Sequence, residues 1–225
     1  MVNSPTLFER IAAITPDIPP NVKLIAVSKQ VPASTIRLAY EAGIRDFGEN
    51  RIQEAIAKQA ELEDLPDIIW HFIGHLQSNK ARKALLHFQY IHSVDNLKLA
   101  QRLNHLAQEL DLKPLVCLQV KILPDPNKSG WDVTQLMADL PELHLCNNLQ
   151  IQGLMTIPPL GLNNIDVKKV FINTKNLGET IKASGFANLQ IKHLSMGMSG
   201  DYKIAIEAGA TMVRLGSILF GERSK

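Results

Sequence analysis

Apolar runs alternate along the chain with segments of helical spacing. The candidate strands are 23–29, 44–50, 68–74, 89–95, 114–121, 149–157, 190–197 and 211–221. Amphipathic helical spacing is found between several of them, at 34–43, 51–62, 96–110, 166–185 and 201–210. Strands that are separated by helices pair in parallel through right-handed crossovers. The alternation therefore predicts an α/β protein with a parallel sheet.

Eight strand-and-helix units predict a single closed (β/α)₈ barrel of the TIM type. We expect one domain over residues 1–225, in which residues 1–22 form an N-terminal helical extension. The alternative is a doubly wound open sheet, which usually has fewer strands and a glycine-rich first turn; that turn is missing after Lys29. The 225 residues are 45% hydrophobic and contain no linker, which is enough for one large core.

Charge and cysteine content exclude several classes of function. The formal net charge is +2, and the main basic cluster, at 80–83, is typical of a solvated helix face, so no nucleic-acid partner is expected. Cys117 and Cys146 have no metal-ligand spacing and indicate a reduced, intracellular protein. Neither a signal peptide nor a membrane-spanning run is present, so we expect a cytoplasmic protein without membrane contact.

Metal and nucleotide sites are also not predicted. The segment "PDPNKSG" at 124–130 lacks the first glycine of a P-loop. His71 and His75 are four residues apart, but they fall in a candidate strand and the turn that follows it, so they would not share a face. The sequence therefore gives no reason to expect ATP or a catalytic metal.

A lysine follows the first candidate strand. The segment "LIAVSKQVP" at 24–32 is typical of a buried strand, yet Ser28 and Lys29 stand at its end. Barrel proteins carry their chemistry at the carboxyl ends of the strands. A lysine amine beside apolar walls can attack an aldehyde and form a Schiff base. The alternative is that Lys29 snorkels to water or pairs with a carboxylate such as Glu49.

A glycine-containing turn near the end of the chain suggests a phosphate site. In "SMGMSGDYKIAIEAG" at 195–209, Gly197 and Gly200 permit a tight turn before a helix that begins near Asp201. Backbone amides around Ser199 and Gly200 would then point at an anion. The alternative is that Ser199 or Asp201 only caps the helix.

The last candidate strand contains a second part of this phosphate site. In "VRLGS" at 213–217, alternation places Arg214 and Gly216 on one face, and Gly216 and Ser217 can add an amide and a hydroxyl. A buried arginine needs a partner, and a structural salt bridge would also satisfy it. Together with Lys29, the two phosphate segments describe a site for an aldehyde that carries a phosphate.

Six motifs spread over residues 24–221 carry a resemblance to a known family. They are "AVSKQVP", "GIRDFGENRIQEA", "WHFIGHLQSNKARK", "IHSVD", "GLMTIPP" and "LSMGMSGDYKIAIEAGATMVRLGSILFG". The chain resembles the pyridoxal phosphate homeostasis protein family, whose fold is similar to the N-terminal barrel of alanine racemase, a fold-type III architecture. The resemblance implies pyridoxal 5'-phosphate (PLP) as the cofactor.

The resemblance also implies the residues that hold PLP. Lys29 is implied as the aldimine lysine, and Arg214 as the arginine that faces the pyridine nitrogen. The others are Ser199, Gly200, Gly216 and Ser217 at the phosphate, Asn50 and Met155 at the ring, and Ser195 near the cofactor.

The function implied by the resemblance is intracellular PLP homeostasis without catalysis. Such a protein buffers PLP or delivers it through transient contact with apo-enzymes, with indirect effects on amino-acid and keto-acid metabolism. An arginine at the ring nitrogen weakens the electron sink that most PLP enzymes use. Four residues follow Gly221, so we expect no second β domain like that of alanine racemase and no catalytic residues. Small size, an exposed cofactor and a modest charge balance favour a monomer. The alternatives are a racemase-like PLP enzyme and a Schiff-base aldolase for phosphorylated sugars.

Overall fold

The computed structural model describes residues 5–221. Its strands are β1 (Lys23–Val27), β2 (Asp46–Glu49), β3 (Ile69–Phe72), β4 (Tyr90–Val94), β5 (Leu115–Lys121), β6 (Trp131–Asp132), β7 (Gln150–Met155), β8 (Leu189–Met198) and β9 (Met212–Leu215). All pairings are parallel, and eight strands form a closed ring in the order β1-β2-β3-β4-β5-β7-β8-β9. The two-residue β6 pairs with β5 and is not part of this ring.

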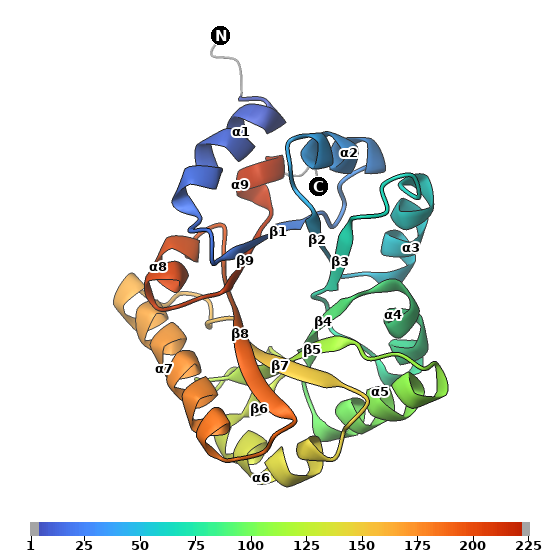
Figure 1. Ribbon diagram of the computed structural model, residues 1–225. Coiled ribbons are helices and arrows are strands. Elements are labelled where there is room, and N and C mark those ends of the chain that lie inside the picture. The colour runs from blue at the N-terminus through green and yellow to red at the C-terminus, as the bar shows by residue number, and fades with distance from the viewer. Residues whose placement is uncertain (1–4, 222–225) are drawn as a thin grey trace.

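Helices surround the strands as an outer layer (Figure 1). They are α1 (Leu7–Ile14), α2 (Ala33–Glu41), α3 (Ile52–Glu61), α4 (Ala81–His87), α5 (Leu97–Glu109), α6 (Val133–His144), α7 (Asn164–Ala183), α8 (Tyr202–Glu207) and α9 (Ser217–Phe220). The predicted barrel is confirmed. The open doubly wound sheet is excluded, because β1 pairs with both β2 and β9 and the ring closes between β4 and β5.

The strands are apolar because a barrel strand is buried on both of its faces. All four residues of β9 are buried, and Ile25 and Ala26 in β1 are each 0% exposed. One face of such a strand packs against the helices and the other fills the barrel interior, so a period of two is not visible. This explains why continuous apolar runs were the correct signal for the strands.

The expected strand at 211–221 is wrong in its second half. Only Met212–Leu215 is extended, and Ser217–Phe220 forms the short helix α9. Gly216 has φ −120° and ψ −84°, which turns the chain out of the strand. A short apolar run such as "SILF" fits a strand or a helix equally well by periodicity. Each of the other seven expected strands overlaps one strand of the ring.

Two helices illustrate what the sequence pattern missed and found. α6 was not expected, because Pro141 lies inside it and interrupts the helical signal. The basic cluster at 80–83 was expected on a helix face; α4 begins at Ala81, and its Arg82 and Lys83 are exposed.

The N-terminal helical extension packs on the last helix of the barrel. α1 starts with a capping box in which Thr6 and Glu9 exchange hydrogen bonds. Arg10 Nε donates to the carbonyl oxygen of Leu219 in α9. Residues 1–4 of the expected extension lie outside the described residues. Within residues 5–221, no helix has both the length and the apolar character needed to cross a bilayer.

Candidate functional site

A cleft of about 400 Å³ lies at the carboxyl ends of the barrel strands. Its lining residues are Val27, Lys29, Asn50, Ile73, Gly74, Ile157, Met198, Ser199, Gly200, Arg214, Gly216 and Ser217. Seven of the nine residues that the sequence singled out are therefore brought together, from β9, the start of α9 and the loops that follow several strands. The other two, Met155 and Ser195, are buried with 1% and 0% exposure and are not among the lining residues.

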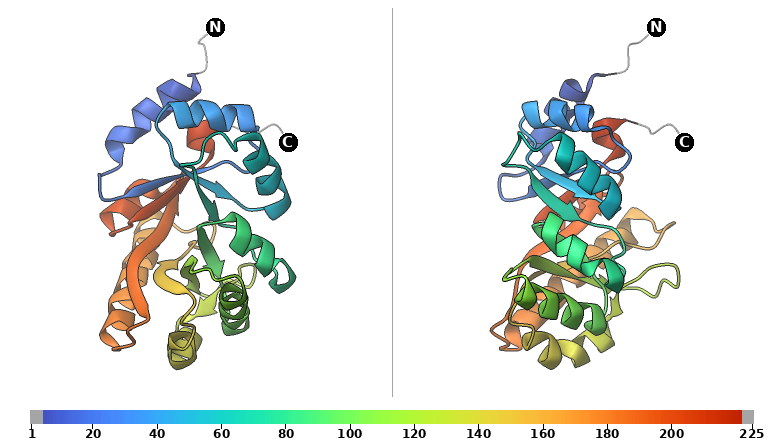
Figure 2. Two further views of the ribbon diagram at one scale, coloured as in Figure 1. Left: turned by 45° about the vertical axis from the view of Figure 1, so that its right-hand side comes forward. Right: turned by 90° about the vertical axis from the view of Figure 1, so that its right-hand side faces the viewer.

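Loops after β5 and β7 border the same end of the barrel. They project together from one side of the molecule (Figure 2). Lys128 Nζ in the first loop donates to the carbonyl oxygens of Ile157 and Pro158 in the second. Because Ile157 lines the cleft, this contact fixes one part of its wall.

The cleft is positively charged. Lys29 and Arg214 line it, and none of its twelve lining residues in the described chain is an aspartate or glutamate. A second hollow, of about 610 Å³, shares Ser199 and Gly200 but also contains the carboxylates of Asp17 and Asp201. Two cations without a carboxylate favour an anionic ligand in the first cleft.

Arg214 is the buried cation of the site. It is 4% exposed, and its Nη1 donates to Ser195 Oγ at 2.7 Å while its Nη2 donates to the carbonyl oxygen of Thr156 at 3.1 Å. Burial lowers the pKa of Arg214 to about 10, so the guanidinium is still charged at neutral pH. No ion pair within residues 5–221 includes Arg214, so the structural salt bridge that the sequence left open is not formed. The guanidinium is held by a hydroxyl and a carbonyl oxygen instead.

The two segments with phosphate-site character are joined by hydrogen bonds. Gly216 N donates to Ser199 Oγ at 3.2 Å, which ties the loop after β8 to the turn after β9. Met198 N donates to Asp201 Oδ1 at 2.6 Å and closes the first loop. The positive φ of Gly197, 94°, permits the turn of the chain before that loop. Asp201 is the N-cap residue of α8, but no side-chain hydrogen bond caps this helix.

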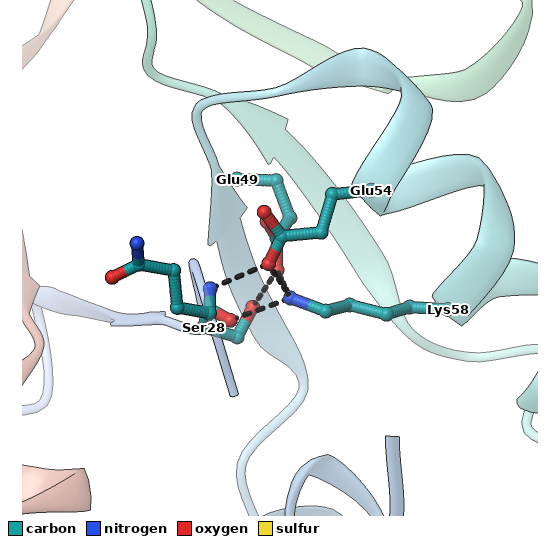
Figure 3. Close-up of polar contacts among 5 residues, drawn as sticks. Ser28, Glu49, Glu54 and Lys58 are labelled. Carbon is teal, nitrogen blue, oxygen red and sulfur yellow. Dashed lines mark hydrogen bonds and ion pairs between the residues drawn. The ribbon is translucent and has the colours of Figure 1, made fainter. Parts of the chain in front are cut away.

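The backbone that precedes Lys29 is anchored to α3. Ser28 is 0% exposed, and its Oγ donates to Glu49 Oε1 at 2.6 Å. Lys58 Nζ donates to the carbonyl oxygen of Ser28 at 2.7 Å and to Glu49 Oε1 at 2.8 Å (Figure 3). Burial raises the pKa of Glu49, and the hydrogen bonds from Lys58 and Ser28 oppose that rise.

The backbone that follows Lys29 is anchored to the same helix. Gln30 has φ 59°, a left-handed conformation that is uncommon outside glycine, and its N–H donates to Glu54 Oε1. Glu54 in turn accepts from Lys58 Nζ at 2.6 Å (Figure 3). Both neighbours of Lys29 are thus fixed by one cluster, which we call the α3 anchor: Ser28, Gln30, Glu49, Glu54 and Lys58.

The α3 anchor excludes one of the alternatives for Lys29. Glu49 pairs with Lys58, and no ion pair within residues 5–221 includes Lys29. Lys29 is half-buried and lines the cleft. Pairing of Lys29 with Glu49 is therefore excluded.

Sequence reasoning missed the supporting residues of the site. Glu54 and Lys58 have i,i+4 spacing on α3, and Lys58 shares the buried face of this helix with Ile52 and Ala55. A lysine on an apolar helix face is a signal that could have been used, because a buried ammonium needs a partner. Gly74 was also missed: a Cβ there would lie 2.3 Å from the carbonyl oxygen of Asn50.

The comparisons with known proteins agree on one family. The alanine racemase N-terminal domain model matches residues 2–224. The pyridoxal phosphate homeostasis protein of Synechocystis is 54% identical over 220 residues, which cover 98% of this chain and 99% of the relative. The chain belongs to the pyridoxal phosphate homeostasis protein family.

Solved structures of similar proteins match the barrel. PipY of Synechococcus elongatus, solved with PLP bound, has a TM-score of 0.92 and 51% identity, with 96% of this chain and 100% of PipY covered. PipY without PLP gives a TM-score of 0.93. Alanine racemase of Clostridium difficile has a TM-score of 0.77 and 18% identity over 97% of this chain and 60% of the racemase, which shows a shared barrel fold.

Proposed function

We propose that this protein binds PLP as an aldimine of Lys29 and acts in intracellular PLP homeostasis, where it buffers or delivers the cofactor. The observation that carries this proposal is the cleft in which Lys29 and Arg214 meet two joined loops and no carboxylate. The printed names of the relatives and the PLP-bound structure of PipY support the choice of ligand.

The donor set of the cleft fits each part of PLP. We assign the phosphate to the two joined loops, through Ser199, Gly200, Gly216 and Ser217. Asn50, from the loop after β2, is assigned to the ring. Arg214 is assigned to the pyridine nitrogen, and Met155 and Ser195 to the buried layer beneath the ring.

PLP supplies an aldehyde that a lysine amine can capture. Lys29 is the residue whose amine would hold this aldehyde as a Schiff base when PLP is bound. The α3 anchor holds the backbone on both sides of Lys29, so its side chain extends into the cleft from a fixed Cα. A fixed point of attachment reduces the reorganisation needed to bring the amine to the ligand.

The same cleft lacks a second acid or base. Among its lining residues in the described chain, Lys29 and Arg214 are the only ones with titratable side chains. A racemase needs a proton donor on the face of the substrate carbon opposite its base. A charged Arg214 also disfavours a protonated ring nitrogen and weakens the electron sink. We therefore propose a binding protein that does not turn over amino acids.

The proposal includes the state in which the protein works. The binding unit is the barrel domain of residues 1–225, acting as a cytoplasmic monomer that meets PLP-dependent apo-enzymes transiently. Sedimentation of the PLP-bound protein should give a single species near 25.0 kDa, the mass of the chain. A dimer that persists on dilution would contradict the monomer.

The test of the proposal is reductive trapping. Purified protein is mixed with PLP, reduced with borohydride and digested, and the pyridoxyl mass is located on the peptides. We expect it on Lys29, together with loss of the visible absorbance on reduction. The variant Lys29→Ala should show neither, whereas Lys98→Ala, an exposed lysine on α5, should behave as wild type. Protein that does not bind PLP would overturn the proposal.

Turnover assays separate a carrier from an enzyme. The PLP-bound protein is incubated with a panel of amino acids, and racemisation, decarboxylation and transamination products are measured. We expect no product beyond the level of PLP alone. Sustained turnover that is lost in Lys29→Ala would show that the protein is a racemase-like enzyme and not a carrier. Trapping only with an added sugar phosphate would indicate the aldolase alternative.

A further inference from the structure

A continuous chain of hydrogen bonds runs through the interior of the barrel. It starts at the amino ends of β1 and β2 and ends at Arg214 beneath the cleft. The successive contacts are Lys23 Nζ to Asp46 Oδ1 at 2.7 Å, Asp46 Oδ1 to His71 Nε2 at 2.8 Å, His71 Nδ1 to His92 Nε2 at 2.9 Å, His92 Nδ1 to Ser195 Oγ at 2.8 Å, and Ser195 Oγ to Arg214 Nη1 at 2.7 Å.

The ends of this chain fix the direction of every hydrogen bond. A guanidinium has only donors, so Arg214 must donate to Ser195 Oγ. At the other end, the ionised carboxylate of Asp46 can only accept, so His71 donates to it from Nε2. With both rings neutral, His71 then accepts at Nδ1 from His92 Nε2, and His92 Nδ1 accepts the Ser195 hydroxyl hydrogen.

Both imidazoles are thereby restricted to one tautomer. His92 without a proton on Nδ1 carries it on Nε2, which donates to His71 Nδ1. His71 in turn carries its proton on Nε2 and donates to Asp46 Oδ1. Each ring is neutral and makes one donor and one acceptor contact, so all four ring nitrogens are satisfied.

The surroundings of the two rings favour the neutral form. His71 and His92 are both 0% exposed, and burial lowers the pKa of each. The charged groups that face the pair are Arg214 and Lys23, with Asp46 at the far end. The other titratable neighbours are Tyr90, which stacks on His71 at 4.5 Å, and His193 on β8.

We propose that His71 and His92 are positioning residues that hold Arg214 for the ligand. Their fixed tautomers keep the hydroxyl hydrogen of Ser195 turned away from Arg214, so that Ser195 Oγ always accepts from the guanidinium. This orients the guanidinium plane while Arg214 still lines the cleft. The proposal rests on the proposed function, in which Arg214 faces the pyridine nitrogen of PLP.

The opposite tautomer would break this arrangement. A proton on His92 Nδ1 would be donated to Ser195 Oγ, which already accepts from Arg214. The Ser195 hydroxyl hydrogen would then have no acceptor in the chain, and its only free direction would compete with the guanidinium. Because Ser195 is 0% exposed, water would not supply the missing acceptor at low cost.

The first experiment is nitrogen NMR of the histidines without any cofactor. Protein labelled with ¹⁵N in its imidazoles is titrated from pH 5 to 8, and the ring resonances are assigned with single histidine variants. At pH 7 we expect two neutral rings that carry the proton on Nε2 and are coupled to each other across a hydrogen bond. A cationic ring, or a proton on Nδ1 of either residue at pH 7, would overturn the proposal. This result does not depend on whether PLP binds.

The second experiment tests the effect on the ligand. In His92→Asn the shorter amide can still accept from Ser195, whereas His92→Leu removes the acceptor. We expect PLP to bind His92→Leu about tenfold more weakly than wild type, the equivalent of one lost hydrogen bond, and His92→Asn to recover most of this loss. His193 is half-buried and does not belong to this series of hydrogen bonds, so His193→Asn should bind PLP as wild type does.

The same titrations contain the result that would contradict the positioning role. Equal PLP affinities for His92→Asn and His92→Leu would show that the acceptor for Ser195 does not matter. If wild type fails to bind PLP while both rings show the expected tautomer, the proposed function falls and the hydrogen-bond chain remains. Thermal melts of every variant identify those that are unfolded. If a variant is unfolded, the NMR result on wild type still decides the tautomers.

Discussion

Lys58 Nζ lies 2.7 Å from the carbonyl oxygen of Ser28, so an ammonium on α3 holds the backbone that leads into Lys29. The side chains of Lys58 and Glu49 are 8% and 0% exposed, and they pair at 2.8 Å. Charges as buried as these are tolerated because they are paired, and removal of one leaves the other without compensation. The α3 anchor is therefore both a stabilising cluster and the support of the candidate site.

Lys58→Met should destabilise the protein strongly. It leaves the Glu49 carboxylate buried without its cation and the Ser28 carbonyl without its donor. Breaking a buried pair in this way typically costs about 3–5 kcal/mol. Urea denaturation of wild type and variant at pH 7 measures the difference.

The matched control for Lys58→Met is the double variant Lys58→Met/Glu49→Gln. It removes both charges and keeps a polar partner for Ser28, so we expect it to recover part of the lost stability. A double variant less stable than Lys58→Met alone would mean that the ion pair is not what stabilises this cluster. PLP affinity measured on the same variants reports whether the anchor also presents Lys29.

A negative charge in the cleft should weaken PLP binding. Ser217 lines the cleft, is exposed, and is assigned to the phosphate. Ser217→Asp places a carboxylate where the cleft has none, and we expect at least a tenfold loss of affinity, about 1.4 kcal/mol. Ser217→Asn has nearly the same shape without the charge and should lose much less. Equal losses for the two variants in fluorescence titrations would contradict an electrostatic role.

The barrel and most of the candidate site could be predicted because both follow from order along the chain. Continuous apolar runs indicated the strands, and parallel strands bring their carboxyl ends together, so Lys29, Ser199 and Arg214 were expected on one face. The lateral contacts could not be predicted in the same way. They depend on strand register and tilt, which the period of a sequence does not specify.

Glu49 illustrates this limit. Its place at the end of β2 made it a reasonable partner for Lys29 at the end of the neighbouring strand. In the structure Glu49 pairs with Lys58 instead, because the buried face of α3 places that lysine beside the end of β2. The contact of His71 with His92 was equally hidden, because the spacing of these histidines along the sequence does not indicate that they meet. Ser195, on β8, reaches them because the ring of strands is closed.

The buried histidines should make the protein sensitive to mild acid. Burial holds the pKa of His92 well below 6.5 and lowers that of His71, while unfolded histidines titrate near 6.5. As the pH falls through 6.5, the unfolded chain takes up protons that the folded chain does not. The free energy of unfolding should therefore decrease with falling pH, by up to about 1.4 kcal/mol per pH unit for each of these histidines.

Urea denaturation at several pH values between 7.5 and 5 checks this acid sensitivity. His92→Asn removes one of the two groups, so its stability should fall less steeply than that of wild type. A slope that is the same in wild type and His92→Asn would show that His92 is already protonated in the folded protein.

Gly74 should be required for the shape of the cleft. A Cβ at this position would lie 2.3 Å from the carbonyl oxygen and 2.8 Å from the carbonyl carbon of Asn50, and backbone atoms cannot move aside as a flexible side chain can. We expect Gly74→Ala to lower the free energy of unfolding by at least about 2 kcal/mol and to displace Asn50 from the cleft.

Gly200→Ala is the stability control, because a Cβ there meets no atom within 4 Å. Urea denaturation of both variants, with PLP titration of Gly74→Ala, measures the two effects. If Gly74→Ala were as stable as wild type and bound PLP equally well, the approach of this loop to Asn50 would not determine the geometry of the site.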